Sequence, residues 1–169
     1  STRRTQVVRA RELDLSAEAP QVLVIDGAGP FSERNITQII EYVANGGAVI
    51  YFLSDILDKG NLDTLALAAK DSVALPFSLT TLLDRQTGSG EAGAMAEVRM
   101  EDAIFRRFKD TGEIGALAFY RYFATERAQG RGEVLARFAD GNLAMGKATL
   151  GAGAILLCNF SAARVASDL

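Results

Sequence analysis

The feature that most constrains the fold is a pair of continuous apolar runs separated by the length of one helix. The first run is 21–26 (QVLVID) and the second is 48–53 (AVIYFL). Unbroken apolar runs of this length are typical of parallel strands that are covered on both faces. Between them, apolar residues recur at helical spacing, at Ile36, Ile39, Ile40 and Val43. This order predicts a right-handed βαβ unit, with Ser32 capping the helix and Asn45-Gly46-Gly47 ending it.

The second half of the chain predicts a different arrangement. Asp140-Gly141 and Gly151-Ala152-Gly153 separate the runs VLARFA, NLAMGKATL and AILLCNF, and Asp-Gly between such runs is a hairpin signal. We therefore expect an antiparallel C-terminal hairpin extension. The alternating segment 5–14 (TQVVRARELD) predicts one more strand. Residues 86–96 (QTGSGEAGAMA) predict a surface loop within a single domain spanning 1–169, because neither side of the loop alone supplies a complete core.

Charge and hydropathy narrow the possible partners. The chain of 169 residues has a net charge of −3, whereas a nucleic-acid partner requires a dense basic surface. Basic residues do cluster near the start of the chain, at Arg3, Arg4, Arg9 and Arg11. We interpret this cluster as a solvated strand edge and terminus. No apolar run approaches the roughly 18 residues that cross a bilayer, so we expect no direct membrane insertion of this domain. The chain has no initiator Met, which suggests a piece excised from a longer protein.

The absence of histidine restricts the chemistry most. It excludes serine and cysteine nucleophiles that depend on an imidazole base, and it excludes metal sites built on histidine. The single cysteine, Cys158, can form neither an internal disulfide nor a thiolate zinc site. Its place in the apolar run ILLCNF indicates an inert thiol in the core. We therefore expect no catalytic residue, no metal centre and no cofactor.

The turn after the first run, Asp26-Gly27-Ala28-Gly29, lies where a dinucleotide-binding fingerprint would begin. Ser32 stands where the third glycine should be, and Pro30 removes an amide donor. Asp26 would also place a carboxylate beside a bound pyrophosphate. An ordinary strand-to-helix turn is the preferred interpretation, and Asp26, Gly27 and Gly29 are kept as candidate ligand-binding residues.

The turn after the second run, Leu53-Ser54-Asp55, lies where many α/β enzymes carry their nucleophile. A serine hydroxyl without a base is a poor nucleophile near neutral pH. Lys59 could serve as a base in principle, but nothing in the surrounding sequence indicates that it is buried. Asp26 and Asp55 follow neighbouring predicted strands, so together they could hold a magnesium ion. Capping of the turns is the simpler role for both carboxylates.

The stretch 22–55 (VLVIDGAGPFSERNITQIIEYVANGGAVIYFLSD) resembles class I glutamine-amidotransferase-like domains. The resemblance is greatest to those in bacterial membrane proteins of the Bat-type aerotolerance-regulator group, which often carry a von Willebrand factor A domain. Further downstream the segments DAIFRRF, FYRYFA, 134–160 and the closing SDL match in the same order. The resemblance implies an α/β fold with a doubly wound, flavodoxin-like, mostly parallel sheet and helices on both faces.

The resemblance also implies where catalysis would take place. Amidotransferases carry a cysteine at the elbow among small residues, with His and Glu partners after a late strand. Here Leu53-Ser54-Asp55 forms a degenerate elbow, and Asn159-Phe160-Ser161 follows the late strand. These features imply a non-catalytic module for assembly or ligand recognition. Its parent would be a protein of the bacterial inner membrane, with this domain outside the cytoplasm and in contact with other domains of the parent or with a protein partner.

Two alternatives remain open from the sequence. The first is a small-molecule or metal-binding module that uses the residues at the ends of the two strands, namely Asp26, Gly27, Gly29, Ser54 and Asp55. The second is a cryptic serine hydrolase that uses Ser54 as its nucleophile.

Overall fold

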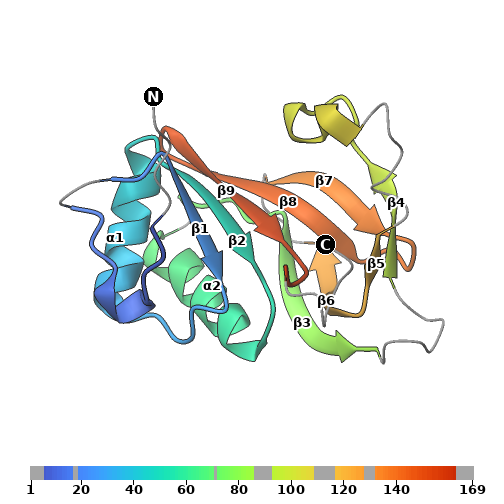
Figure 1. Ribbon diagram of the computed structural model, residues 1–169, viewed down its shortest axis with the longest axis horizontal. Helices are drawn as coiled ribbons and strands as arrows, with labels where there is room; N and C mark the ends of the chain where they lie inside the picture. The colour runs from blue at the N-terminus through green and yellow to red at the C-terminus, as the bar shows by residue number, and fades with distance from the viewer. Residues whose placement is uncertain are drawn as a thin grey trace.

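The computed structural model describes residues 6–16, 19–70, 72–85, 93–108, 117–127 and 132–162. Strands outnumber helices in this part of the chain (Figure 1). In chain order the elements, with 3-10 helices written η, are η1 (Ala10–Glu12), β1 (Val22–Asp26), α1 (Glu33–Ala44), β2 (Ala48–Phe52), α2 (Ile56–Ala68), β3 (Phe77–Asp84), β4 (Gly93–Val98), η2 (Ala103–Phe108), β5 (Ala118–Phe119), β6 (Arg121–Arg127), β7 (Glu133–Phe138), β8 (Leu143–Leu150) and β9 (Gly153–Cys158).

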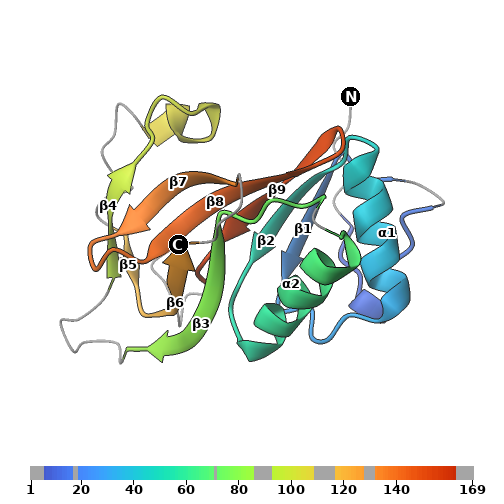
Figure 2. The same cartoon turned by 180° about the vertical axis from the view of Figure 1, so that it is seen from behind.

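The main sheet is a mixed sheet of seven strands in the order β1-β2-β9-β8-β7-β4-β5. Only β1, β2 and β9 run parallel to one another, and every other pairing in the sheet is antiparallel. The sheet curls along its length, and β3 pairs with β6 in a second, two-stranded sheet (Figures 1 and 2). The predicted doubly wound, flavodoxin-like and mostly parallel sheet is therefore wrong. The predicted C-terminal hairpins are present, because β8 pairs antiparallel with both β7 and β9. They are part of the main sheet, however, and not an extension of it.

The predicted βαβ unit is confirmed by the pairing of its strands. β1 and β2 pair in parallel from Val22 opposite Ala48 to Asp26 opposite Phe52, and α1 connects them. The Ser32 side chain accepts a hydrogen bond from the Asn35 amide, so it caps α1 as expected. The sequence therefore predicted this unit correctly.

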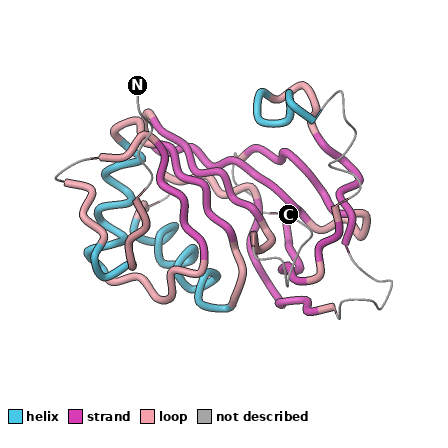
Figure 3. The backbone as a smooth tube through the Cα atoms, viewed as in Figure 1, coloured by secondary structure: helices cyan, strands magenta, loops and turns pink. Residues whose placement is uncertain are grey.

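The predicted cover of helices on both faces is also wrong. Both α-helices of the described part lie at the β1–β2 end of the molecule and pack on the same face of these strands (Figures 2 and 3). Ile25 of β1 is buried on that face, but Val22 and Val24, which alternate with it, are 46% and 57% exposed. The chain after α2 continues almost entirely in strands, so no further α-helix is available in the described part to cover the outer face of β1.

Two hydrophobic clusters divide the core. The first joins α1, α2, β3 and the inner face of the parallel strands, with Ile39, Leu62 and Phe77 at its centre. The second joins β7, β8 and the short β5, with Phe119 and Phe138 packed at a centroid distance of 5.5 Å. The ends of β1 and β2, where the candidate residues lie, pack on the first cluster through Ile25 and Leu53.

Two smaller predictions also need correction. The predicted strand 5–14 contains η1 instead, closed by a hydrogen bond from the Glu12 amide to the Arg9 carbonyl, and its described residues join no sheet. The predicted loop 86–96 overlaps β4, whose Met95 is buried, and residues 86–92 lie outside the described part. In the described residues we find no helix with the length and apolar character needed to span a bilayer.

Candidate functional site

The candidate residues lie at one edge of the sheet, where β1 and β2 end side by side. Asp26, the last residue of β1, pairs with Phe52, the last residue of β2. The turns that follow these strands carry the two groups predicted from the sequence. The structure places the two turns in different surroundings: the turn after β2 is closed by hydrogen bonds, and the turn after β1 borders an open cleft.

In the elbow after β2, the residues on both sides of Ser54 are held in place by packing or by hydrogen bonds. Leu53 is fully buried, and its amide donates to the Cys158 carbonyl of β9 over 2.8 Å. Asp55 is the N-cap of α2, and its Oδ1 accepts from the amides of Leu57 (2.8 Å) and Asp58 (3.2 Å). Both side chains therefore serve the turn itself: Leu53 fills the core, and Asp55 satisfies amides that an uncapped helix would leave unpaired.

Ser54, the candidate nucleophile, is bound to a buried carboxylate that the sequence did not single out. Its hydroxyl donates to Asp58 Oδ2 over 2.9 Å, and its amide donates to the same oxygen over 2.9 Å. The amide of Asp55 also donates to this oxygen, over 3.1 Å. Asp58 is only 1% exposed. Its carboxylate therefore occupies the space that faces the hydroxyl and both amides of the elbow.

The same carboxylate belongs to a buried network that joins both turns. Tyr51 donates its hydroxyl proton to Asp58 Oδ1 over 3.1 Å. Asn61 Nδ2 donates to the Tyr51 hydroxyl (3.2 Å) and to the Gly29 carbonyl (2.7 Å), and Asn61 Oδ1 accepts from the Phe31 amide (2.8 Å). Burial, followed by the charge of Asp58, raises the pKa of Tyr51, so this hydroxyl remains a donor. The network connects α2 to the loop after β1 through the hydrogen bonds of Asn61.

Tyr51, Asp58 and Asn61 were missed by sequence reasoning, although a signal for two of them was present. Asp58 and Asn61 lie on the helix face that Leu62 and Leu65 bury, so polar residues occupy positions where the helical period expects apolar ones. The spacing Asp55-x-x-Asp58 is also that of a capping box, with the second acid reaching back to the N-cap amide.

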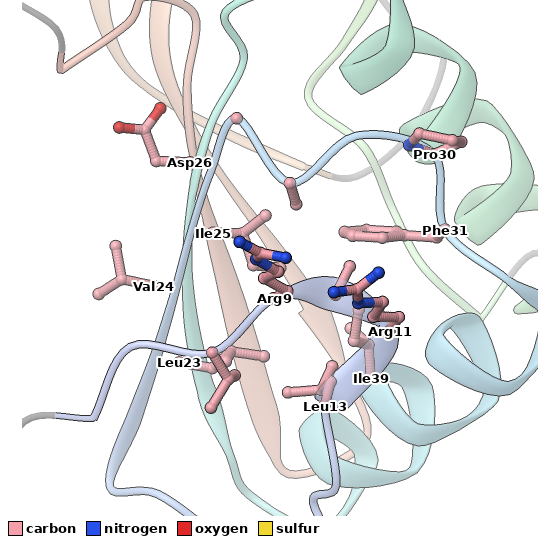
Figure 4. A pocket seen from close by; sticks show the side chains of 14 residues that line it. Arg9, Arg11, Leu13, Leu23, Val24, Ile25, Asp26, Pro30, Phe31 and Ile39 are labelled. Carbon is pink, nitrogen blue, oxygen red and sulfur yellow. The ribbon is translucent and has the colours of Figure 1, made fainter.

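Asp26 and Asp55 face different surroundings, because the Asp55 carboxylate caps α2. The Asp26 carboxylate points to the opposite side of β1 from the cleft (Figure 4). Partial burial, followed by the charge of Asp58, raises the pKa of Asp26. In the ranges that the structure describes, no group of three or more His, Cys, Asp or Glu residues could hold a metal ion. Gly27 and Gly29 both have positive φ (56° and 71°), which accounts for glycine at these positions.

A cleft of about 480 Å³ opens beside the turn after β1. The segment around η1 forms one wall, and β1 with the β1–α1 loop forms the other (Figure 4). Its apolar lining includes Leu13, Leu23, Ile25, Phe31 and Ile39, and its charged lining is Arg9, Arg11 and Asp26. Ser54 and Asp55 do not line it. The predicted ligand-binding set is thus divided, because only Asp26 and Gly27 border this cleft.

The remaining candidates for chemistry have structural roles. Cys158 is 2% exposed, and burial raises the pKa of its thiol to about 12. Lys59 Nζ lies 2.6 Å from Asp63 Oδ2, one helical turn further along α2. Asn159, which follows β9, is fully buried and bonds the main chain of Phe123 and Leu143. These groups serve packing and hydrogen bonding.

No family model matches the chain, and no curated protein matches it at a significant level. Solved structures do match. A cytoplasmic protein from Salmonella typhimurium LT2 superposes with a TM-score of 0.61 at 14% identity, covering 92% of this chain and 64% of its own. A second Salmonella typhimurium cytoplasmic protein also gives a TM-score of 0.61 at 14% identity, covering 84% and 61%. The beta-galactosidase of Bacillus circulans sp. alkalophilus gives 0.58 at 16% identity, covering 89% and 21%.

The chain thus spans less than two thirds of the length of these similar structures. At these identities the similarity shows a shared fold alone. The resemblance to glutamine-amidotransferase-like domains stays a prediction.

Proposed function

We propose that the chain is a non-catalytic module that serves assembly or ligand recognition within a larger protein. One observation carries the proposal: Asp58 Oδ2 accepts the hydroxyl of Ser54 together with the amides of Ser54 and Asp55. At a catalytic elbow, the amide of the residue after the nucleophile helps to form the oxyanion hole. Here that amide belongs to Asp55, and a buried carboxylate occupies its donor.

Asp58 is also poorly placed to act as the missing base. Its two oxygens accept four hydrogen bonds, from the Tyr51 and Ser54 hydroxyls and from two amides. A general base must be oriented toward a nucleophile that a substrate can also reach. The negative charge of Asp58 would repel the oxyanion of an acyl-transfer transition state. The same network that stabilises the turn therefore disfavours hydrolysis at Ser54.

We infer the cellular setting from the resemblance. The parent would be a bacterial inner-membrane protein, with this domain outside the cytoplasm and bound to other domains of the parent or to a protein partner. The description of two similar structures as cytoplasmic proteins argues for the opposite side of the membrane. Protease accessibility of the domain in spheroplasts that express the parent decides between the two sides.

Assays of glutamine and activated-ester hydrolysis test the absence of catalysis. We expect no turnover above buffer for the native chain and no change in Ser54→Ala. Ser78→Ala, which removes an exposed hydroxyl from β3, is the matched control. Turnover that is lost in Ser54→Ala and kept in Ser78→Ala would overturn the proposal.

A further inference from the structure

We propose that the cleft between the η1 segment and the β1–α1 loop binds a small organic anion, with Arg9 and Arg11 as its charge partners. The proposal rests on the part of the proposed function that concerns ligand recognition. It places that recognition in this cleft and names organic anions as the ligand class. It also changes our interpretation of these arginines, which the sequence suggested were only a solvated strand edge.

The two guanidinium groups are available for a ligand. Arg9 forms no ion pair with any residue in the described ranges. Arg11 contacts Glu12 only through Nε, at 3.5 Å, and its side chain is 71% exposed. An exposed pair of this length contributes little, and it leaves the two terminal nitrogens of Arg11 for another partner. Guanidinium groups bind carboxylate and phosphate in bidentate geometry.

The positions of the charges favour an anion over a cation. Figure 4 shows the guanidinium groups of Arg9 and Arg11 projecting from the η1 segment on the side of the β1–α1 loop. Among the residues that the structure describes, Asp26 is the only acidic one in the lining, and its carboxylate points to the other side of β1. The charge that faces the cleft from its lining is therefore positive.

The rest of the cleft fits an apolar body attached to the anionic group. Leu23, Ile25 and Ile39 line its floor beside Phe31. A volume of about 480 Å³ lies within the range of small-molecule sites, roughly 300–1,000 Å³. The amide of Ala28, a residue of the lining, donates to no acceptor within the described residues. The loop therefore leaves one unpaired donor beside the cleft.

Titration with phenyl phosphate and with benzoate, followed by amide and arginine side-chain NMR shifts at low salt, tests the proposal. We expect saturable shifts in residues 8–13 and 23–31. Arg9→Gln combined with Arg11→Gln should weaken binding roughly tenfold or more, because hydrogen bonds to charged groups are lost. Arg106→Gln removes an exposed arginine of η2, distant from the cleft, and should leave binding unchanged (Figure 1). Neutral benzamide should bind roughly tenfold more weakly than benzoate.

Either of two results would overturn the proposal: no saturable shift with either anion, or equal binding by the double variant. Circular dichroism and thermal unfolding verify that each variant is folded, and the single variants Arg9→Gln and Arg11→Gln should each lose part of the affinity. This test is independent of the hydrolysis assays. A chain that neither binds anions nor hydrolyses substrates would contradict the anion site only, whereas Ser54-dependent hydrolysis would contradict the non-catalytic function only.

Discussion

Ser54 and Asp58 are joined twice, because both the hydroxyl and the amide of Ser54 donate to Asp58 Oδ2 over 2.9 Å. These two hydrogen bonds close the strand-to-helix turn. Asp58 is the third residue of α2, so its carboxylate also belongs to the helix cap, where a negative charge interacts favourably with the helix dipole. The contact that stabilises the turn thus also occupies the amides of Ser54 and Asp55.

Removing Asp58 should destabilise the domain more than removing any exposed acid of α2. Asp58→Ala leaves the Tyr51 hydroxyl and the amides of Ser54 and Asp55 without their acceptor, and we expect a loss of about 2–4 kcal/mol in the free energy of unfolding. Asp63→Ala, which removes only an exposed ion pair with Lys59, should cost about 0.5 kcal/mol or less. Urea unfolding measures both, and equal losses would show that the network is not structural.

Tyr51→Phe tests the part of the network that joins β2 to α2. The change removes one hydroxyl that contacts Asp58 and Asn61 and keeps the ring in the core. We expect a loss of about 1–2 kcal/mol, since a buried acceptor and a buried donor each lose a partner. Tyr120→Phe is the control, because no described residue bonds its hydroxyl. If both variants unfold at the native urea midpoint, Tyr51 contributes only its ring.

Asp26→Asn should stabilise the domain at neutral pH. The pKa of Asp26 is raised in the folded state by burial and by Asp58, so the folded state binds its proton more tightly than the unfolded state does. Ionisation of this carboxyl therefore reduces stability as the pH rises through and above its usual range near 3.8. We expect a gain of about 0.5 kcal/mol or less at pH 7, because the group is largely solvated, and none at pH 3. Thermal unfolding at both pH values measures the difference; a gain at pH 3 equal to that at pH 7 would exclude ionisation as its cause.

Cys158 should resist alkylation in the folded protein. The pKa of its thiol is about 12 and the residue is 2% exposed, so the thiolate that would attack iodoacetamide is scarce and shielded at pH 8. We expect no adduct in the native protein over a period that fully modifies it in urea, as followed by intact mass spectrometry. Rapid modification of the native protein would mean that β9 opens, or that the thiol is not buried.

The sequence was sufficient for local features and insufficient for long-range ones. The βαβ unit and its Ser32 cap depend on residues close together in the chain, and the structure confirms them. Both β1 and β2 are apolar runs, yet Val24 of β1 is 57% exposed, whereas Ile50, its partner in β2, is partly buried against the second cluster. Which strand lies at the edge depends on pairing with β9, more than 100 residues away, and periodicity does not report that pairing.

The candidate site was predicted only in part, for two different reasons. Asp58 reaches Ser54 from four positions along the chain, and the capping-box spacing that indicates it is local. Asn61 reaches Gly29 across 32 positions, a contact that local sequence does not report. Arg9 borders the β1 turn from the η1 segment, where the sequence predicted a strand. The sequence located this cluster of arginines but predicted only a solvated edge for it.

Reaction with a fluorophosphonate, followed by intact mass spectrometry, tests the central claim most directly. This reagent labels a serine only when a base activates its hydroxyl and an oxyanion site receives the phosphoryl oxygen. Because Asp58 occupies both the hydroxyl and the amides of the elbow, we predict no adduct at Ser54 after prolonged incubation. A stoichiometric adduct that maps to Ser54 and disappears in Ser54→Ala would show an open and activated elbow, and would contradict the non-catalytic account.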